Sequence, residues 1–343
     1  MKKKSAMFAS LRKRIFAGLM FLMLSGQAFA DEALIEAAKK EQQLVYYTGM
    51  PVTDAKVLLA SFEKKYPFIK TTHYRAGGPA LISRIQNEYR AGRHLWDVFS
   101  QPGLDGYLLL EQGFLAKYDS PERKYFREGH KDSEGFWTTL YTTPNVASYN
   151  RKLVSTKELP RDYFDLLDSK WKGKLGLDSR EVEWYANIKQ ILGPGKSRKL
   201  FEGLRTQDIG VRQGRSLLTE LLGAGEFYIL VNNYLQNVID AKEKGSPVEF
   251  FVLDPVILAA GPIAINKAAP HPNAARLFVD YCLSKEGQAL LVRLRRSSAR
   301  MDIEGNPIDQ IKNARLVSSD IKLGKTYVES FKEYQELLGI VKK

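Results

Sequence analysis

The sequence is poor in the residues that build disulfide frameworks and zinc centres. Its 343 residues include four histidines and one cysteine, Cys282. A single cysteine excludes an internal disulfide and any cysteine-rich zinc module, and its apolar neighbours indicate a small buried side chain. The sequence also lacks a His-Glu-x-x-His motif, a P-loop and a Gly-x-Ser-x-Gly motif. We therefore expect no cofactor and no enzymatic activity, with a secreted hydrolase as the remote alternative.

Long hydrophobic runs are equally scarce. The run from Ile15 to Leu24 has about ten residues, half of the roughly 20 that cross a bilayer. Lysines and arginines precede it, and the small-residue pattern Ala28-Phe29-Ala30 follows it. A basic start, a short apolar run and such a site are typical of a secretory signal peptide. We expect residues 1–30 to be removed after Ala30 and the mature chain to lie in the periplasm.

The formal net charge of +13 has a local origin. Six of the excess positive charges precede Ile15, so the predicted mature chain carries +7. Residues 293–343 hold eleven Lys and Arg against seven Asp and Glu, and the remainder is nearly balanced. Because the charge forms no broad basic face, we expect no nucleic-acid partner.

Predicted strands and helices alternate along the mature chain. Apolar and β-branched runs predict strands at 44–49, 69–75 and 96–99, with helices between them. Further strands are predicted at 145–150, 171–178, 227–231, 248–253 and 256–265, one long helix from Pro272 through Leu291, and a last helix near 326–340. This order indicates an α/β fold with mostly parallel strands. We expect residues 31–143 plus 262–343 to form one lobe and residues 144–261 a second, with a hinge and a central ligand cleft.

Eight segments in register resemble the solute-binding proteins of ABC importers. They include LVYYTG, EQGFLAKYDSP, GAGEFYILVNNY and HPNAARLFVDYCLSKEGQALL, and they span residues 43 to about 300. The similarity is to the branch of the type II periplasmic binding fold that contains ferric-iron, phosphonate, sugar-phosphate and thiamine binders. The resemblance implies a two-lobed fold, a periplasmic role, and permease and ATPase partners. It leaves the ligand open.

Ferric iron is one candidate ligand. The iron binders of this branch use adjacent tyrosines in an Asn-Asn-Tyr-Tyr segment, and some use a histidine after the first strand. Here Leu235 follows Tyr234, and residues 48–52 contain neither histidine nor carboxylate. Tyr234 would be the metal ligand if iron binds, and iron would need further phenolates, for which Tyr46, Tyr47 and Tyr185 are available.

An anionic organic solute is the competing candidate, and it is the one that we favour. Arg75 with Gly77 and Gly78 lies between a predicted strand and helix, and Arg212 with Arg215 precedes a helix for which Ser216 is the predicted N-cap. Free backbone N–H groups and the helix dipole favour anions at such corners, and arginine pairs well with carboxylate or phosphate. The alternative is that both corners are simple turns.

Aromatic and polar residues complete the predicted site. Tyr47, Trp184, Tyr185 and Tyr234 are candidates for its walls, and packing inside the lobes is the alternative for Trp184 and Tyr185. Thr48 and Asn233 adjoin Tyr47 and Tyr234 in the sequence. We therefore predict a monomeric periplasmic protein that captures a small anion (an organic phosphate, phosphonate or carboxylate) and delivers it to a permease.

Overall fold

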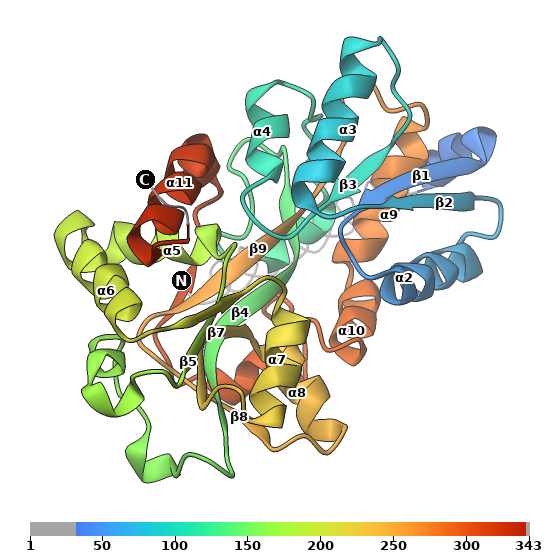
Figure 1. The fold of residues 1–343 in the computed structure, drawn as a ribbon. Coiled ribbons are helices and arrows are strands. Elements are labelled where there is room, and N and C mark those ends of the chain that lie inside the picture. The colour runs from blue at the N-terminus through green and yellow to red at the C-terminus, as the bar shows by residue number, and fades with distance from the viewer. Residues whose placement is uncertain (1–31, 341–343) are drawn as a thin grey trace, which may run out of the picture.

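The first lobe is built on parallel strands that alternate with helices. The computed structural model describes residues 32–340, so the predicted signal peptide and its cleavage site lie outside the described residues. Strand β1 (Gln43–Thr48) lies between β2 (Lys70–Arg75) and β3 (Val98–Ser100), parallel to both. The helices of this lobe are one at 32–41, α2 (Val52–Lys65), α3 (Gly78–Arg90), α4 (Gly106–Glu111), α9 (Pro272–Leu283) and α10 (Lys285–Arg293). Their apolar faces cover both sides of the sheet (Figure 1).

The second lobe repeats this design. Strand β5 (Leu175–Asp178) lies parallel to β6 (Gly210–Arg212) and β7 (Ile229–Tyr234), and β8 (Val248–Phe251) joins by pairing with β4. The helices of this lobe are α5 (Val182–Leu192), α6 (Pro194–Thr206), α7 (Arg215–Ala224) and α8 (Leu235–Glu243). A second set of buried apolar clusters fills this lobe.

Two long antiparallel strands connect the lobes. Strands β4 (Thr138–Asn150) and β9 (Val256–Ile265) pair with each other in the middle of the sheet order β2-β1-β3-β9-β4-β7-β5-β6. Beyond that pairing β9 continues along β3, whereas β4 continues along β7 and β8. Every residue of both strands is buried. The predicted lobe boundaries, 143/144 and 261/262, fall within these two strands and remain predictions.

The C-terminal segment contacts both lobes. Strand β10 (Leu316–Ser318) pairs with β9, and the 3-10 helix η6 (Ile321–Thr326) packs on α4. The last helix, α11 (Tyr327–Leu338), then packs against α5 and α6 (Figure 1). Its residues Tyr334 and Leu337 belong to the core of the second lobe. The described residues contain no helix long and apolar enough to span a bilayer.

Several predicted elements differ from the structure at their ends. The strand expected at 145–150 is the second half of β4, and the strand expected at 171–178 begins only at Leu175, after a 3-10 turn. The single helix expected from Pro272 is broken at Ser284, whose hydroxyl accepts a hydrogen bond from the backbone N–H of Gly287 and so starts α10. Ser216 is not an N-cap, because α7 begins at Arg215 after Gly214. Cys282 is free and buried, as predicted.

Candidate functional site

Polar residues from both lobes meet where the ends of β3, β5 and β7 approach one another. The loop after β3 brings Gly103 against α5: a side chain at Gly103 would begin 3.6 Å from Oε2 of Glu183. The charge of Arg180, on the second lobe, also acts on Asp105, on the first lobe. We call this region the interlobe junction and define it by Gln101, Asp105, Arg180, Glu181, Glu183, Arg215, Asn232 and Tyr234. Binding proteins with open α/β sheets hold ligands at such strand ends.

Arg215 is the buried cation of the interlobe junction. Its side chain is 7 % exposed, and its Nη2 forms an ion pair with the Glu181 carboxylate. The guanidinium carbon lies 3.3 Å from the ring centroid of Tyr234. The Nε and Nη1 atoms are buried and have no hydrogen-bond partner among the described residues. Arg215 therefore retains donors that an anion can accept.

Two neighbouring asparagines on β7 have different roles. Asn233 is fully bonded: its Nδ2 donates to Ser148 Oγ and Thr219 Oγ1, and its Oδ1 accepts from the backbone N–H of Tyr234. Asn232 is 1 % exposed, and neither its Oδ1 nor its Nδ2 has a partner within residues 32–340. A buried amide without partners costs about 1–3 kcal/mol. Such groups are rare in native proteins, and a water, an ion or a ligand can supply the missing partner.

Asn233 was predicted from the sequence as a site residue, whereas Asn232 was not. Side chains in a regular strand alternate between its two faces, so a sequence pattern places Asn232 on the face of Tyr234 and Asn233 on the other face. In the structure the pairing of β7 with β4 shifts register at this point. Once Tyr234 is taken as a site residue, this period of two points to Asn232. The buried carboxylates Glu181 and Glu183, which were also not predicted as site residues, lie at the N-cap and in the first turn of α5, just before the predicted aromatic residues.

Two acidic side chains at the junction have raised pKa values. Burial raises the pKa of Asp105 to about 6, and the nearby charge of Arg180 limits the rise. Burial likewise raises the pKa of Glu183 to about 7; a hydrogen bond from Ser319 opposes this rise and the charge of Asp105 adds to it. The Glu183 Oε1 and Gln101 Oε1 atoms are buried acceptors without partners in the described part of the chain. The junction thus offers acceptors as well as donors.

Of the four predicted aromatic walls, Tyr47, Trp184 and Tyr185 pack within the lobes, whereas Tyr234 lies at the interlobe junction. Tyr47 packs in the core of the first lobe, where its hydroxyl donates to Glu88. Trp184 donates to the hydroxyl of Tyr163, and both Trp184 and Tyr185 pack edge-on against Phe201. The structure therefore shows the packing role that the sequence left open for Trp184 and Tyr185. Thr48 is buried beside Tyr47 and hydrogen-bonds to Ser100.

Only part of each predicted arginine corner lies at the interlobe junction. Arg75 and Gly77 are exposed at the end of β2, whereas Gly78 is buried, and a side chain there would begin 1.9 Å from Asp105 Oδ2. Arg212 is exposed and forms an ion pair with Glu226. Ser216 lines a separate pocket of about 290 Å³ between α7 and α8. Of the predicted arginines, Arg215 is the one that lies at the interlobe junction.

The residues available for iron are mostly in the cores. Tyr46 is fully buried and hydrogen-bonds to Ser100, and its pKa is raised by burial. Tyr234 is at the junction, where burial raises its pKa and the charge of Arg215 opposes the rise. Within residues 32–340 no group of three or more His, Cys, Asp or Glu side chains is placed to hold a metal ion.

Known proteins share this fold. In the Serratia marcescens "Fe(3+)-binding periplasmic protein", 288 residues align at 23 % identity and cover 80 % of this chain and 82 % of that protein. Iron-bound HitA from Pseudomonas aeruginosa superposes with a TM-score of 0.75 at 21 % identity, over 86 % of this chain and 99 % of that chain. AfuA from Actinobacillus pleuropneumoniae, solved with fructose-6-phosphate bound, superposes with a TM-score of 0.74 at 22 % identity, over 87 % and 99 %.

A family profile covers more than half of the chain. The profile described as bacterial extracellular solute-binding protein matches residues 97–321, which include the second lobe, both connecting strands and the Asn232–Tyr234 segment. The two-lobed fold that the sequence predicted is thereby confirmed, together with its solute-binding role. The chain therefore belongs to the bacterial extracellular solute-binding protein family.

Proposed function

We propose that the chain is the receptor of an ABC importer and that its interlobe junction binds a small organic anion. The unbonded amide of Asn232 carries this proposal, because a buried amide with neither bond made favours a ligand that both donates and accepts. Arg215 supplies the donors for an anionic group. Glu183 and Gln101 supply acceptors, which suit hydroxyl groups on the same ligand.

This donor set favours a hydroxylated phosphate, phosphonate or carboxylate over a bare inorganic ion. The fructose-6-phosphate bound to AfuA is a ligand of this class in a protein of the same fold. We further propose that the protein is a monomer and that it passes its ligand to a membrane permease, which works with an ATPase. Export to the periplasm by the N-terminal segment and closure of the two lobes about β4 and β9 belong to the same proposal.

Titration calorimetry tests the proposal. The mature protein is titrated with a panel of sugar phosphates, phosphonates and hydroxycarboxylates, alongside an Asn232→Leu variant. We expect at least one compound of the panel to bind to the wild type, and the variant to lose at least about tenfold in affinity. Binding that Asn232→Leu leaves unchanged would place the ligand elsewhere, and turnover of any compound would indicate an enzyme instead.

Ferric iron is the second candidate, and the printed names of the Serratia protein and HitA support it. Tyr234 is the one tyrosine of the predicted iron ligands at the junction, and its ring faces the guanidinium of Arg215. Adding ferric citrate to the mature protein tests this candidate, because an iron–phenolate bond absorbs visible light. A visible band that is lost in Tyr234→Phe would establish iron, and no band with no iron retained after dialysis would remove it.

A further inference from the structure

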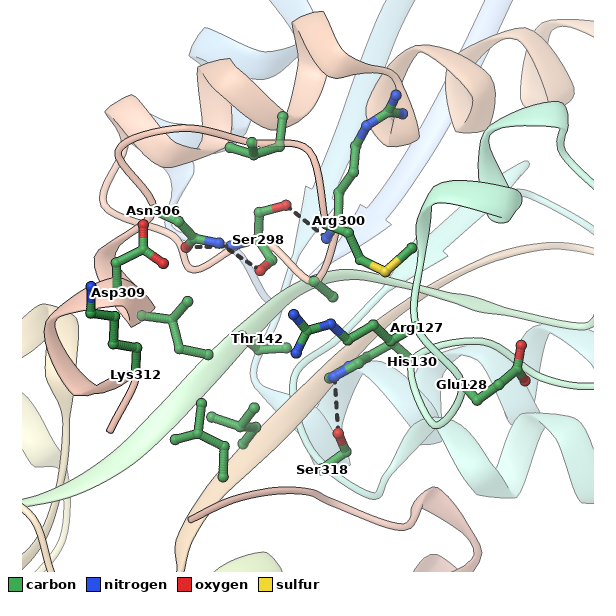
Figure 2. A pocket seen from close by; sticks show the side chains of 16 residues that line it. Arg127, Glu128, His130, Thr142, Ser298, Arg300, Asn306, Asp309, Lys312 and Ser318 are labelled. Atoms are coloured by element: carbon green, nitrogen blue, oxygen red, sulfur yellow. Dashed lines mark hydrogen bonds between the residues drawn. The ribbon is translucent and has the colours of Figure 1, made fainter. Parts of the chain in front are cut away.

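A second pocket lies away from the interlobe junction, beside the strands that connect the lobes. It has a volume of about 430 Å³ and is bordered by the loop at 127–130, by Thr142 of β4, by Leu258 of β9 and by the segment at 298–318 (Figure 2). None of the residues that define the interlobe junction lines it. We call it the hinge pocket.

One wall of the hinge pocket is fixed to the first lobe. Arg127 follows Phe126, which forms a β-bridge with Arg300 and packs in the core of the first lobe. The Arg300 guanidinium is bonded to Glu122 and Asp302 and is not free for a ligand. The loop that carries Arg127 is therefore held by first-lobe contacts.

The opposite wall is fixed to the second lobe. Lys312 follows Ile311, which packs with Leu218 and Val238 of helices α7 and α8. Leu316 packs against the same cluster. Because the two walls are anchored to different lobes, a rotation of one lobe against the other about β4 and β9 changes their separation.

Two cations face this pocket from the two walls. Figure 2 shows Arg127 on one side and Lys312 on the other. Neither side chain has a hydrogen-bond or ion-pair partner among the described residues. Two carboxylates also border the pocket: Glu128 is ion-paired with Lys131, and Asp309 is exposed on the same wall as Lys312. The charges at the pocket that have no ion-pair partner within the protein therefore sum to a positive value.

His130 adds a neutral hydrogen-bonding group. It is 6 % exposed, and its Nε2 shares a hydrogen bond of 2.9 Å with Ser318 Oγ. Its Nδ1 is buried and has no partner within the described part of the chain. Burial, together with the charge of Arg127, lowers the pKa of His130 to about 4, so the imidazole is neutral at pH 7. The pocket thus holds, beside its cations, a buried imidazole with one ring nitrogen that has no partner.

We propose that the hinge pocket is a second binding site, for a small multivalent oxyanion held between Arg127 and Lys312. Phosphate and polycarboxylate groups share the required chemistry, because guanidinium and ammonium groups both bind their oxygens. An anion that bridges the walls stabilises the lobe arrangement in which the walls are close. It thereby couples this site to opening and closing at the interlobe junction.

Titration with inorganic phosphate tests the hinge pocket. Binding to the mature protein is measured by calorimetry at low ionic strength, with four variants beside the wild type. Arg127→Gln/Lys312→Gln removes both cations. Lys312→Gln alone is a milder change that keeps the test possible if the double variant misfolds. Arg93→Gln/Lys196→Gln removes the same charge from exposed positions away from the pocket. Asn232→Leu reports on the interlobe junction.

We expect phosphate to bind to the wild type, to the charge-matched control and to Asn232→Leu alike. The double pocket variant should bind at least about tenfold more weakly, and Lys312→Gln should lie between. No binding up to about 10 mM phosphate would overturn the proposal. So would equal losses in the pocket variant and the charge-matched control, or a loss confined to Asn232→Leu.

Discussion

The guanidinium of Arg215 lies over the ring of Tyr234, with 3.3 Å between the guanidinium carbon and the ring centroid. This contact joins the start of α7 to the end of β7. Because burial raises the pKa of Tyr234, its hydroxyl is protonated at neutral pH despite the nearby charge of Arg215. Binding of an organic anion requires no change at this hydroxyl, whereas binding of ferric iron to the phenolate requires the loss of its proton.

Replacing Arg215 should destabilise the protein as well as its site. Arg215→Met leaves the Glu181 carboxylate buried without its cation, and breaking such a pair costs about 3–5 kcal/mol. We expect the free energy of unfolding, measured by urea denaturation, to fall by about 3 kcal/mol. Ligand binding at the interlobe junction should be lost in the same variant.

The neighbouring Arg212 provides a matched control. Its ion pair with Glu226 is exposed, so Arg212→Met should cost less than about 1 kcal/mol. The double variant Arg215→Met/Glu181→Leu should recover part of the stability, because no unpaired charge remains. Equal effects of Arg215→Met and Arg212→Met would contradict the burial of the Arg215–Glu181 pair.

The two asparagines of β7 should respond in opposite ways to the same substitution. Asn233→Leu breaks hydrogen bonds to Ser148, Thr219 and the backbone of Tyr234, at about 1 kcal/mol each. Asn232→Leu breaks none, so its unfolding free energy should stay within about 1 kcal/mol of the wild type or rise. Thermal and urea unfolding of both variants measure this. A large destabilisation by Asn232→Leu would mean that its amide is bonded within the protein.

The fold was predictable from the sequence because its signals are local. Periodic apolar residues, together with glycine and proline at the ends of elements, located most of the strands and helices of both lobes, but not α8 or β10. The ends of these elements were less predictable, because tertiary contacts determine where a strand or helix begins and ends. The first half of β4 is one case: it contains Thr138, Thr139, Thr142 and Thr143, and only pairing with β9 makes it a buried strand.

The site was harder to predict because its residues come from distant segments of both lobes. The sequence of one segment does not show which residues of the other lobe lie near it. Trp184 and Tyr185 looked like candidate walls, yet their helix turns them into the core against Phe201. Asp105 and Glu183 lie far apart in the sequence, and their raised pKa values arise only when the lobes bury them. Arg215 and Tyr234 were identified through sequence reasoning, and their stacking became visible only in the structure.

The stability of the protein should depend on pH through Asp105 and Glu183. The pKa of Asp105 is raised from 3.8 to about 6 and that of Glu183 from 4.5 to about 7. Between these limits the native state binds more protons than the unfolded state, so the contribution of both groups to stability falls as pH rises from about 4 to about 7. Urea denaturation of wild type and Glu183→Gln across this range measures the effect.

We expect Glu183→Gln to become progressively more stable than the wild type as pH rises through this window. The comparison with the variant cancels the opposing contribution of His130. Because the pKa of His130 is lowered to about 4, its contribution to stability is lost as the pH falls from about 6.5 to about 4. A difference between variant and wild type that stays constant over the window would contradict the raised pKa of Glu183.

The predicted export signal can be tested by mass spectrometry. Expressed with residues 1–30 in a Gram-negative host, the protein should be recovered from the periplasm as a chain that begins at Asp31. Ala30→Phe places a large residue at the cleavage site and should block processing, whereas Phe29→Leu should not, because that position tolerates larger residues. Unprocessed wild-type protein would contradict the prediction.

The last helix should stabilise the second lobe rather than merely follow it. Tyr334 on α11 is fully buried, and its hydroxyl donates to the backbone carbonyl of Asp178, at the end of β5, over 2.5 Å. Tyr334→Phe should cost about 1 kcal/mol through this hydrogen bond, and Tyr334→Ala about 3–5 kcal/mol through the added cavity. Val328→Ala on the same helix should cost less than about 0.5 kcal/mol, because Val328 is 75 % exposed. If Tyr334→Ala unfolded like the Val328 control, α11 would be a dispensable tail; the expected ranking instead makes it a support for the end of β5, and through β5 for the strand ends that carry the interlobe junction.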